Sequence, residues 1–126
     1  MQQGDCVADI FALIDDIFFQ SKLLETAKHT GVELKAFSSS DALLAALNSA
    51  NGTAPRLIVV DLNARSSPIE AIASMRARDS QIPVVSFFSH VQTELAQRAR
   101  EAGCTEILPR SKFTKDLAAI FSRAKS

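Results

Sequence analysis

The sequence has no tryptophan and no tyrosine, and it has only two cysteines, Cys6 and Cys104. These cysteines form neither a Cys-x-x-Cys motif nor a cluster with histidine, so we expect free thiols rather than a metal site or a disulfide. No apolar run reaches the roughly 18 residues that span a membrane. The N-terminus also lacks the basic start and apolar core of a signal peptide. We therefore predict a cytoplasmic protein that has no membrane partner.

Two sequence motifs of enzyme chemistry are missing as well. The segment Asp15–Phe19, which follows the first apolar run, contains no glycine and so does not match a phosphate-binding loop. No G-x-S-x-G sequence marks a hydrolase nucleophile, and neither His29 nor His90 has an evident charge-relay partner. We do not expect an enzyme.

The length of 126 residues favours a single domain, and 47 % hydrophobic residues are ample for its core. The formal net charge is zero, but residues 1–61 carry eight acidic and four basic side chains, whereas residues 62–126 carry six acidic and ten basic ones. The basic residues are interleaved with acidic ones, a pattern of solvated helix faces. We therefore expect no nucleic-acid partner.

The most informative stretch is Leu57–Asp61, a short apolar run rich in β-branched residues that ends in a carboxylate. This pattern predicts a strand buried on both faces. Asp61 would then lie at the carboxyl edge of a sheet, where open α/β sheets bind ligands. A second apolar run, Ile10–Ile14, ends in the same way at Asp15 and Asp16. If the two strands are neighbours, three carboxylates meet at one place.

Strand and helix patterns alternate along the chain without a hairpin signal or an internal repeat. Repeated βα units imply a parallel sheet covered by helices on both faces, and the usual order of five such strands is 2-1-3-4-5. We therefore predict an α/β fold, a flavodoxin-like (βα)5 three-layer sandwich. The expected strands are 9–14, 32–37, 57–61, 83–88 and 105–108, and the expected helices are 18–28, 42–49, 68–78, a fourth that ends near 102, and a fifth near the C-terminus.

Helix ends are marked by glycine and by polar residues. Gly31 is expected to be a left-handed cap after the first helix. Ser67–Glu70 is an S-x-x-E capping box with proline at the first helical position, and Ser89–Gln92 is an S-x-x-Q box. Ser111 or Thr114 is expected to cap the last helix. The apolar stripe of that helix is Phe113, Leu117, Ile120 and Phe121.

Clustered carboxylates repel one another, so at least one of them should have a raised pKa. Mg²⁺ relieves such repulsion and prefers oxygen ligands, often one or two carboxylates together with phosphate. Asp61 can then act as a nucleophile toward a phosphoryl group, because carboxylates form acyl phosphates. The new charge needs a cation and a hydroxyl donor nearby. Arg110 follows the fifth strand and Ser89 follows the fourth, both at the same edge of the sheet.

These features together resemble the receiver domain of two-component response regulators, a CheY-like domain, over about residues 8–122 of a single domain spanning 1–126. The residues that carry the resemblance are Leu13–Asp16, Leu57–Asn63, Ile82–Val85, Ala102–Cys104 and Ile107–Ser111.

The resemblance implies a phosphorelay signalling function that depends on Mg²⁺. In receivers the acidic pair, here Asp15 and Asp16, binds the metal together with the acid that ends the third strand, here Asp61. The residue two positions later, here Asn63, offers its backbone carbonyl to the metal. Asp61 accepts the phosphoryl group from a histidine kinase or a phosphotransfer protein, and Arg110 is the partner of the phosphate or carboxylate.

The resemblance also implies output through protein–protein contacts. The chain ends shortly after the fifth helix, so we expect a stand-alone regulator whose downstream protein partner binds the face made by the fourth helix, the fifth strand and the fifth helix. Homodimerisation on that face is left open. The basic residues of the face are Arg98, Arg100, Lys112 and Lys115.

Several positions depart from the receiver pattern and point to an atypical receiver or pseudo-receiver. The loop after Asp61 lacks the usual Met-Pro and Asp-Gly pairs. Phe88 stands where receivers have the switch hydroxyl, and Ser89 comes one residue late. Arg110 replaces the usual lysine, and Ile107 replaces an aromatic residue.

Alternative roles remain open for the same residues. Asp61 and Arg110 can form a permanent ion pair that blocks phosphorylation. Asp15 or Asp16 can simply cap the first helix, and Ser89 can cap the fourth helix instead of acting as a switch hydroxyl. The alternative function is a phosphorylation-independent pseudo-receiver interaction module. A third class is a flavodoxin-like domain that binds a small molecule.

Overall fold

The computed structural model describes residues 8–48, 55–65, 67–77, 81–88 and 93–124. Five strands and six helices follow one another along these residues. The strands are β1 (Ile10–Leu13), β2 (Leu34–Phe37), β3 (Leu57–Asp61), β4 (Val84–Phe88) and β5 (Glu106–Pro109). The helices are α1 (Ile17–Thr30), α2 (Ser40–Asn48), α3 (Pro68–Ala77), α4 (Thr93–Ala102), α5 (Arg110–Lys115) and α6 (Leu117–Ser122).

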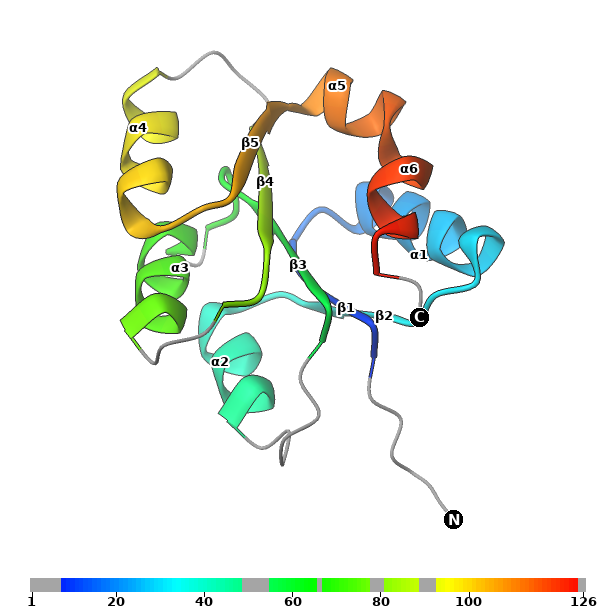
Figure 1. Ribbon diagram of the computed structural model, residues 1–126, viewed down its shortest axis with the longest axis horizontal. Helices are drawn as coiled ribbons and strands as arrows, with labels where there is room; N and C mark the ends of the chain where they lie inside the picture. The colour runs from blue at the N-terminus through cyan, green and yellow to red at the C-terminus, as the bar shows by residue number, and fades with distance from the viewer. Residues whose placement is uncertain (1–7, 49–54, 66, 78–80, 89–92, 125–126) are drawn as a thin grey trace.

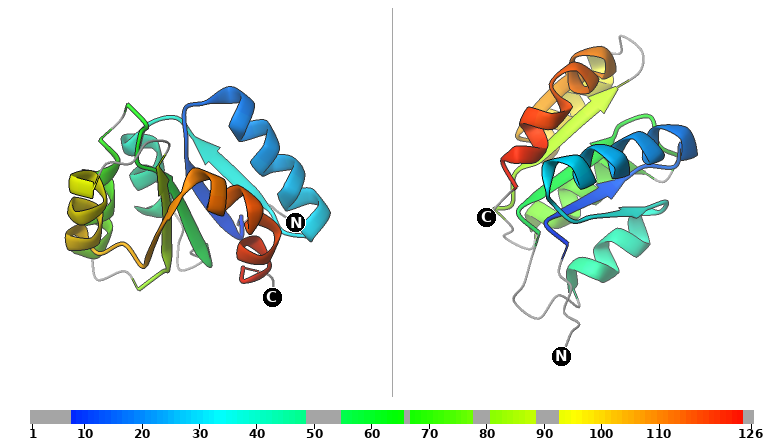
Figure 2. Two further views of the ribbon diagram at one scale, coloured as in Figure 1. Left: turned by 90° about the horizontal axis from the view of Figure 1, so that it is seen from above. Right: turned by 90° about the vertical axis from the view of Figure 1, so that its right-hand side faces the viewer.

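The strands form one parallel sheet in the order β2-β1-β3-β4-β5. Helices α2, α3 and α4 cover one face, and α1, α5 and α6 cover the other (Figures 1 and 2). The predicted three-layer α/β sandwich and its strand order are therefore confirmed.

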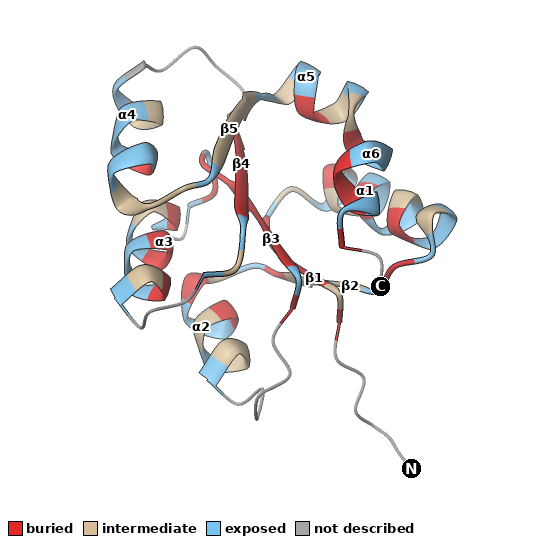
Figure 3. Cartoon of the chain, in the orientation of Figure 1, coloured by how far each residue is buried: buried red, intermediate tan, exposed pale blue. Residues whose placement is uncertain are grey.

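The centre of the sheet is buried on both faces, as the apolar sequence of β3 predicts. Every residue of β3 is buried, and so is every residue of β1 (Figure 3). β2 lies at an edge of the sheet and is only partly buried, which agrees with its alternation of apolar and charged residues. The boundaries of β3 are those predicted from the sequence.

An aromatic cluster fills the core beneath α1 and α5. The rings of Phe87 and Phe113 are stacked with 4.5 Å between their centroids. Phe19 meets Phe87 edge-on at 5.2 Å and lies 6.1 Å from Phe113. All three side chains are buried. Such ring pairs add about 0.5–1.5 kcal/mol each beyond their burial, so the position of Phe19 at the start of α1 is well defined.

The C-terminal helix differs from the prediction. It consists of two short helices, α5 and α6, that meet at Asp116, and Pro109 occupies the N-cap position without a side-chain hydrogen bond. Neither Ser111 nor Thr114 caps it, because α5 already begins at Arg110. The predicted apolar stripe is nevertheless buried over both helices, so the break leaves the packing face continuous.

Three local predictions are confirmed. Gly31 caps α1 in the left-handed conformation with φ of 84°, α3 begins at Pro68, and Cys104 is a free thiol. Among the described residues, no helix is long and apolar enough to cross a membrane. Cys6 and the capping box Ser89–Gln92 lie outside the described residues.

Of the two glycines that the structure describes, Gly103 is the one at which we expect a side chain to be less tolerated. Its φ is 113°, and an added Cβ would lie 2.5 Å from Cγ of Arg76, whose Nε donates to the Gly103 carbonyl. Gly103→Ala should lower the free energy of unfolding by about 1–3 kcal/mol, as measured by urea denaturation. Gly31→Asn is the control and should cost less than about 1 kcal/mol, because asparagine tolerates the left-handed conformation. Equal losses in the two variants would contradict this explanation.

Candidate functional site

Three carboxylates meet at the carboxyl edge of the sheet. β1 and β3 are parallel neighbours in a register that pairs Leu13 with Val60, so Asp15 and Asp16 follow β1 at the same edge where Asp61 ends β3. Burial, and then the charges of Asp15 and Asp16, raise the pKa of Asp61. The pairing of β1 with β3 confirms the expectation that the three acids lie at one edge of the sheet.

Asp61 is the buried member of this group, with 5 % of its surface exposed. Its Oδ1 accepts a hydrogen bond of 2.9 Å from the backbone N–H of Asn63. Its second oxygen receives no hydrogen bond from any residue that the structure describes. Burial raises the pKa of Asp61, and the charges of Asp15 and Asp16 add to this effect, whereas the Asn63 N–H and the charge of Arg110 oppose it. Asp61 is therefore a poorly compensated carboxylate.

Asp15 is exposed and joins two loops of the site. Its Oδ2 accepts a hydrogen bond of 3.0 Å from the backbone N–H of Arg65. This contact ties the segment after β1 to the loop after β3, 50 positions further along the chain. Asp15 thus restrains the loop that begins at Asp61.

Asp16 is the N-cap of α1, as one of the sequence alternatives predicted. Its Oδ1 accepts hydrogen bonds from the backbone N–H groups of Phe18, at 3.0 Å, and Phe19, at 3.2 Å. Its Oδ2 accepts one of 3.2 Å from Nη2 of Arg110. The Phe19 N–H and then the Arg110 guanidinium lower the pKa of Asp16. Asp16 is therefore compensated, in contrast to Asp61.

Arg110 forms its ion pair with Asp16 rather than with Asp61. The Nη2–Oδ2 distance is 3.2 Å, and both side chains are about one third exposed. The guanidinium carbon also lies 4.1 Å from the centre of the Phe19 ring, a stacked cation–π geometry. Among the described residues Asp61 takes part in no ion pair. The alternative of a permanent Asp61–Arg110 pair is therefore wrong, because the Phe19 ring and Asp16 hold the guanidinium elsewhere.

The carboxylates share one edge of the sheet, but they are not arranged as a ready metal site. Within the described part of the chain, no group of three or more His, Cys, Asp or Glu side chains is placed to hold a metal ion. Both oxygens of Asp16 are already used, one by the start of α1 and one by Arg110. The assignment of Asp15, Asp16, Asp61 and the Asn63 carbonyl as metal ligands stays a prediction.

Phe19 is the residue of the site that sequence analysis missed. The sequence assigned Phe19 no role in the site and showed only that the segment Asp15–Phe19 lacks glycine. In the structure, the Phe19 ring is the surface on which the Arg110 guanidinium lies. Its position three residues after the N-cap Asp16, in the first turn of α1, was the available signal. Ser89, the expected hydroxyl donor, lies outside the described residues.

The sequence matches no protein-family model. It also matches no curated protein sequence. Solved structures, however, match most of the chain. The phosphorylated cyanobacterial phytochrome response regulator RcpA matches with a TM-score of 0.77 and 20 % identity, over 93 % of this chain and 90 % of that chain. The receiver domain of NtrX from Brucella abortus matches with a TM-score of 0.76 and 22 % identity, over 92 % and 97 %.

A third match is the BeF3-activated DrrB receiver domain, with a TM-score of 0.74 and 18 % identity over 94 % of this chain and 97 % of that chain. Against a longer NtrX chain, the match covers 27 % of that chain. At these identities the likeness shows the fold. The chain has the CheY-like fold of a response regulator receiver domain.

The raised pKa of Asp61 predicts that its charge destabilises the fold. A carboxyl group that binds its proton more tightly when folded lowers stability as the pH rises from the ordinary pKa of 3.8 through the folded value. Asp61→Asn should therefore raise the free energy of unfolding at pH 7 by on the order of 1 kcal/mol. That corresponds to about 3–5 °C in melting temperature for a domain of this size, and the gain should shrink below the ordinary pKa.

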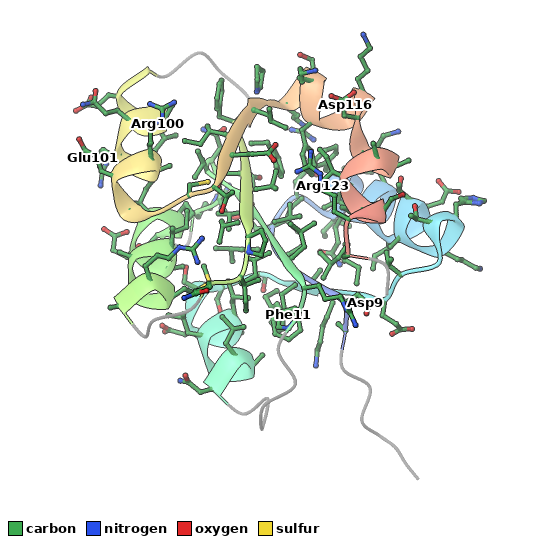
Figure 4. All side chains as sticks on the ribbon, viewed as in Figure 1. Asp9, Phe11, Arg100, Glu101, Asp116 and Arg123 are labelled. Carbon is green, nitrogen blue, oxygen red and sulfur yellow. The ribbon has the colours of Figure 1, made fainter. Side chains whose placement is uncertain are left out.

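Asp116→Asn is the matched control. Asp116 lies between α5 and α6 (Figure 4), and a hydrogen bond from Lys112 lowers its pKa. This substitution should not raise the melting temperature. A lower melting temperature for Asp61→Asn at pH 7 would show that the Asp61 charge is compensated in the folded protein.

Proposed function

We propose that this protein is a receiver-type signalling domain in which Asp61 accepts a phosphoryl group from a histidine kinase or a phosphotransfer protein. The observation that carries this proposal is the burial of the Asp61 carboxylate and its incomplete hydrogen bonding. Asp61 is a buried carboxylate at the end of the central strand, with one oxygen free of hydrogen bonds from the described residues. The receiver fold supports the same function.

The chemistry is a transfer between two nucleophiles. An Asp61 oxygen forms a bond to phosphorus while the bond from phosphorus to the nitrogen of the donor histidine breaks, and the donor nitrogen keeps the electron pair. The product is an acyl phosphate on Asp61. Arg110 directly follows β5 at the same edge of the sheet and pairs with Asp16 there, so it supplies positive charge near this product. The protein is then a phosphorylated switch rather than an enzyme acting on a small substrate.

Oxygen donors of the kind that a divalent cation such as Mg²⁺ prefers lie around Asp61, although the side chains that the structure describes are not arranged as a ready metal site. Hard cations take carboxylate and carbonyl oxygens, and Asp61 offers a buried carboxylate whose charge lacks compensation. The residues that would hold the ion are Asp15, Asp61, the backbone carbonyl of Asn63 and, once it is free of Arg110, Asp16. When bound, Mg²⁺ neutralises the carboxylates and the incoming phosphoryl oxygens.

Output through a protein partner is part of the proposal. The α4-β5-α5 face carries Arg98 and Arg100, both exposed, on α4. Lys112 and Lys115 are exposed on α5, although Lys112 is paired with Asp116. These basic side chains, which lie among the exposed Glu94 and Glu101 of α4, can pair with acidic groups of a downstream partner or of a second copy of the chain. We propose that the protein acts in the cytoplasm.

A second candidate function is a phosphorylation-independent interaction module. The ion pair between Arg110 and Asp16 favours this function. In this pair the guanidinium of Arg110 already neutralises the charge of Asp16, one of the expected metal ligands. In this case the receiver fold serves as a fixed binding surface, and Asp61 is not modified.

A small acyl phosphate donor with millimolar Mg²⁺ separates the two functions. The wild-type chain should gain the mass of one phosphoryl group, and peptide mapping should locate it on Asp61. Asp61→Asn should reduce the modified fraction at least about tenfold, since its amide is not a nucleophile comparable to a carboxylate. Intact-mass spectrometry measures both.

The matched control is Asp41→Asn, which alters an exposed carboxylate on α2 and should leave the modified fraction unchanged. Wild-type protein that remains unmodified by the small donor and by histidine-phosphorylated donor proteins would refute phosphorylation on Asp61 and favour the interaction module.

A further inference from the structure

The two oxygens of Asp16 have separate partners. Oδ1 caps α1 by accepting the backbone N–H groups of Phe18 and Phe19. Oδ2 accepts Nη2 of Arg110 at 3.2 Å. The first role belongs to the fold, because an uncapped helix start leaves backbone donors without partners. Only Oδ2 can be exchanged without disturbing α1, and Arg110 occupies it.

Arg110 is held at Oδ2 by more than charge. The guanidinium carbon lies 4.1 Å from the centre of the Phe19 ring. Phe19 is only 5 % exposed and is packed against Phe87 and Phe113, so the ring is a fixed surface. The stacked face and the carboxylate together define one place for the guanidinium. Since arginine does not lose its proton in proteins, this competitor is present at every accessible pH.

We propose that Arg110 is an internal competitor of the divalent cation at Asp16, so that the stacking of Arg110 on Phe19 sets how tightly this domain binds metal. This inference rests on the metal site of the proposed function. A cation can use Asp16 Oδ2 only after the guanidinium leaves it, and the guanidinium charge also opposes an incoming cation nearby. Phe19 is therefore a positioning residue: it does not contact the metal, and it affects metal affinity only by holding Arg110 at Asp16.

The first experiment measures Mg²⁺ affinity by titration calorimetry at constant ionic strength. Arg110→Ala should bind Mg²⁺ about fivefold more tightly than wild type, or better, because a partly exposed ion pair no longer has to break. Arg110→Lys keeps the charge but loses the planar stack, so its affinity should lie between the two. Phe19→Leu keeps Arg110 and removes the aromatic face, and it should also bind more tightly than wild type.

The matched control is Arg123→Ala. Arg123 forms an ion pair with Glu106 and lies beside the C-terminal helices (Figure 4), so its removal deletes a similar charge away from the carboxylates. This variant should bind Mg²⁺ as wild type does. Asp61→Asn identifies the site, since metal bound among the carboxylates should weaken in that variant. Melting curves of each variant without metal check that the fold is retained.

A second measurement follows Arg110 itself. Protons over the face of an aromatic ring resonate at unusually high field, so the Arg110 side chain should show this shift in metal-free protein. Saturating Mg²⁺ should remove the shift as the guanidinium leaves Phe19. A shift that persists at saturation would overturn the proposal, because the metal would then bind without displacing Arg110.

The outcomes separate this inference from the proposed function. If Arg110→Ala binds Mg²⁺ no more tightly than wild type while Asp61→Asn weakens binding, the metal site stands and the competition is refuted. If no variant binds Mg²⁺, the competition and the metal dependence both fail. If Arg110→Ala binds more tightly and Arg123→Ala does not, the competition is supported, even where Asp61 takes no phosphoryl group from any donor.

Discussion

Like charge at the carboxyl edge of the sheet is the constraint on which the site depends. Parallel pairing of β1 with β3 brings Asp15, Asp16 and Asp61 to one edge, and carboxylates this close repel one another. The structure relieves this repulsion unequally. Asp16 receives two backbone N–H groups and a guanidinium, whereas Asp61 is buried with one hydrogen bond from the described residues. Asp61 is thus the least compensated of the three carboxylates.

Arg110, at the position where the resemblance to receivers implies a lysine, differs from a lysine in more than size. A guanidinium is planar, and it can stack on a ring while it donates a hydrogen bond in its own plane. Both contacts are present, to Phe19 and to Asp16. The aromatic core beneath α1 therefore extends to the edge of the site, because Phe87 and Phe113 support the ring that carries the guanidinium. Core packing and site electrostatics are linked through one side chain.

The success of the strand predictions has a physical explanation in particular segments. β3 is apolar throughout and ends in Asp61, so its boundaries follow from a pattern that tertiary contacts reinforce. β2 alternates apolar and charged residues and lies at the edge, as that pattern requires. The last helix was predicted less well. Its apolar stripe is continuous, but Pro109 sets its start and Asp116 divides it, and hydrophobic periodicity does not register such a break.

The order of strands and helices, the parallel sheet and the edge at which the three acids gather all follow from patterns in the amino-acid sequence. These features depend on local periodicity and on the narrow choice of connections between βα units. The identity of the carboxylate that Arg110 neutralises, in contrast, depends on the packing of the folded chain. Asp16 and Arg110 are 94 positions apart, and the choice depends on where the Phe19 ring lies after α1 has packed against α6 and the sheet. The electrostatic energy that favours one of two neighbouring acids depends on differences of a few ångströms in charge separation. No pattern in the sequence encodes such differences.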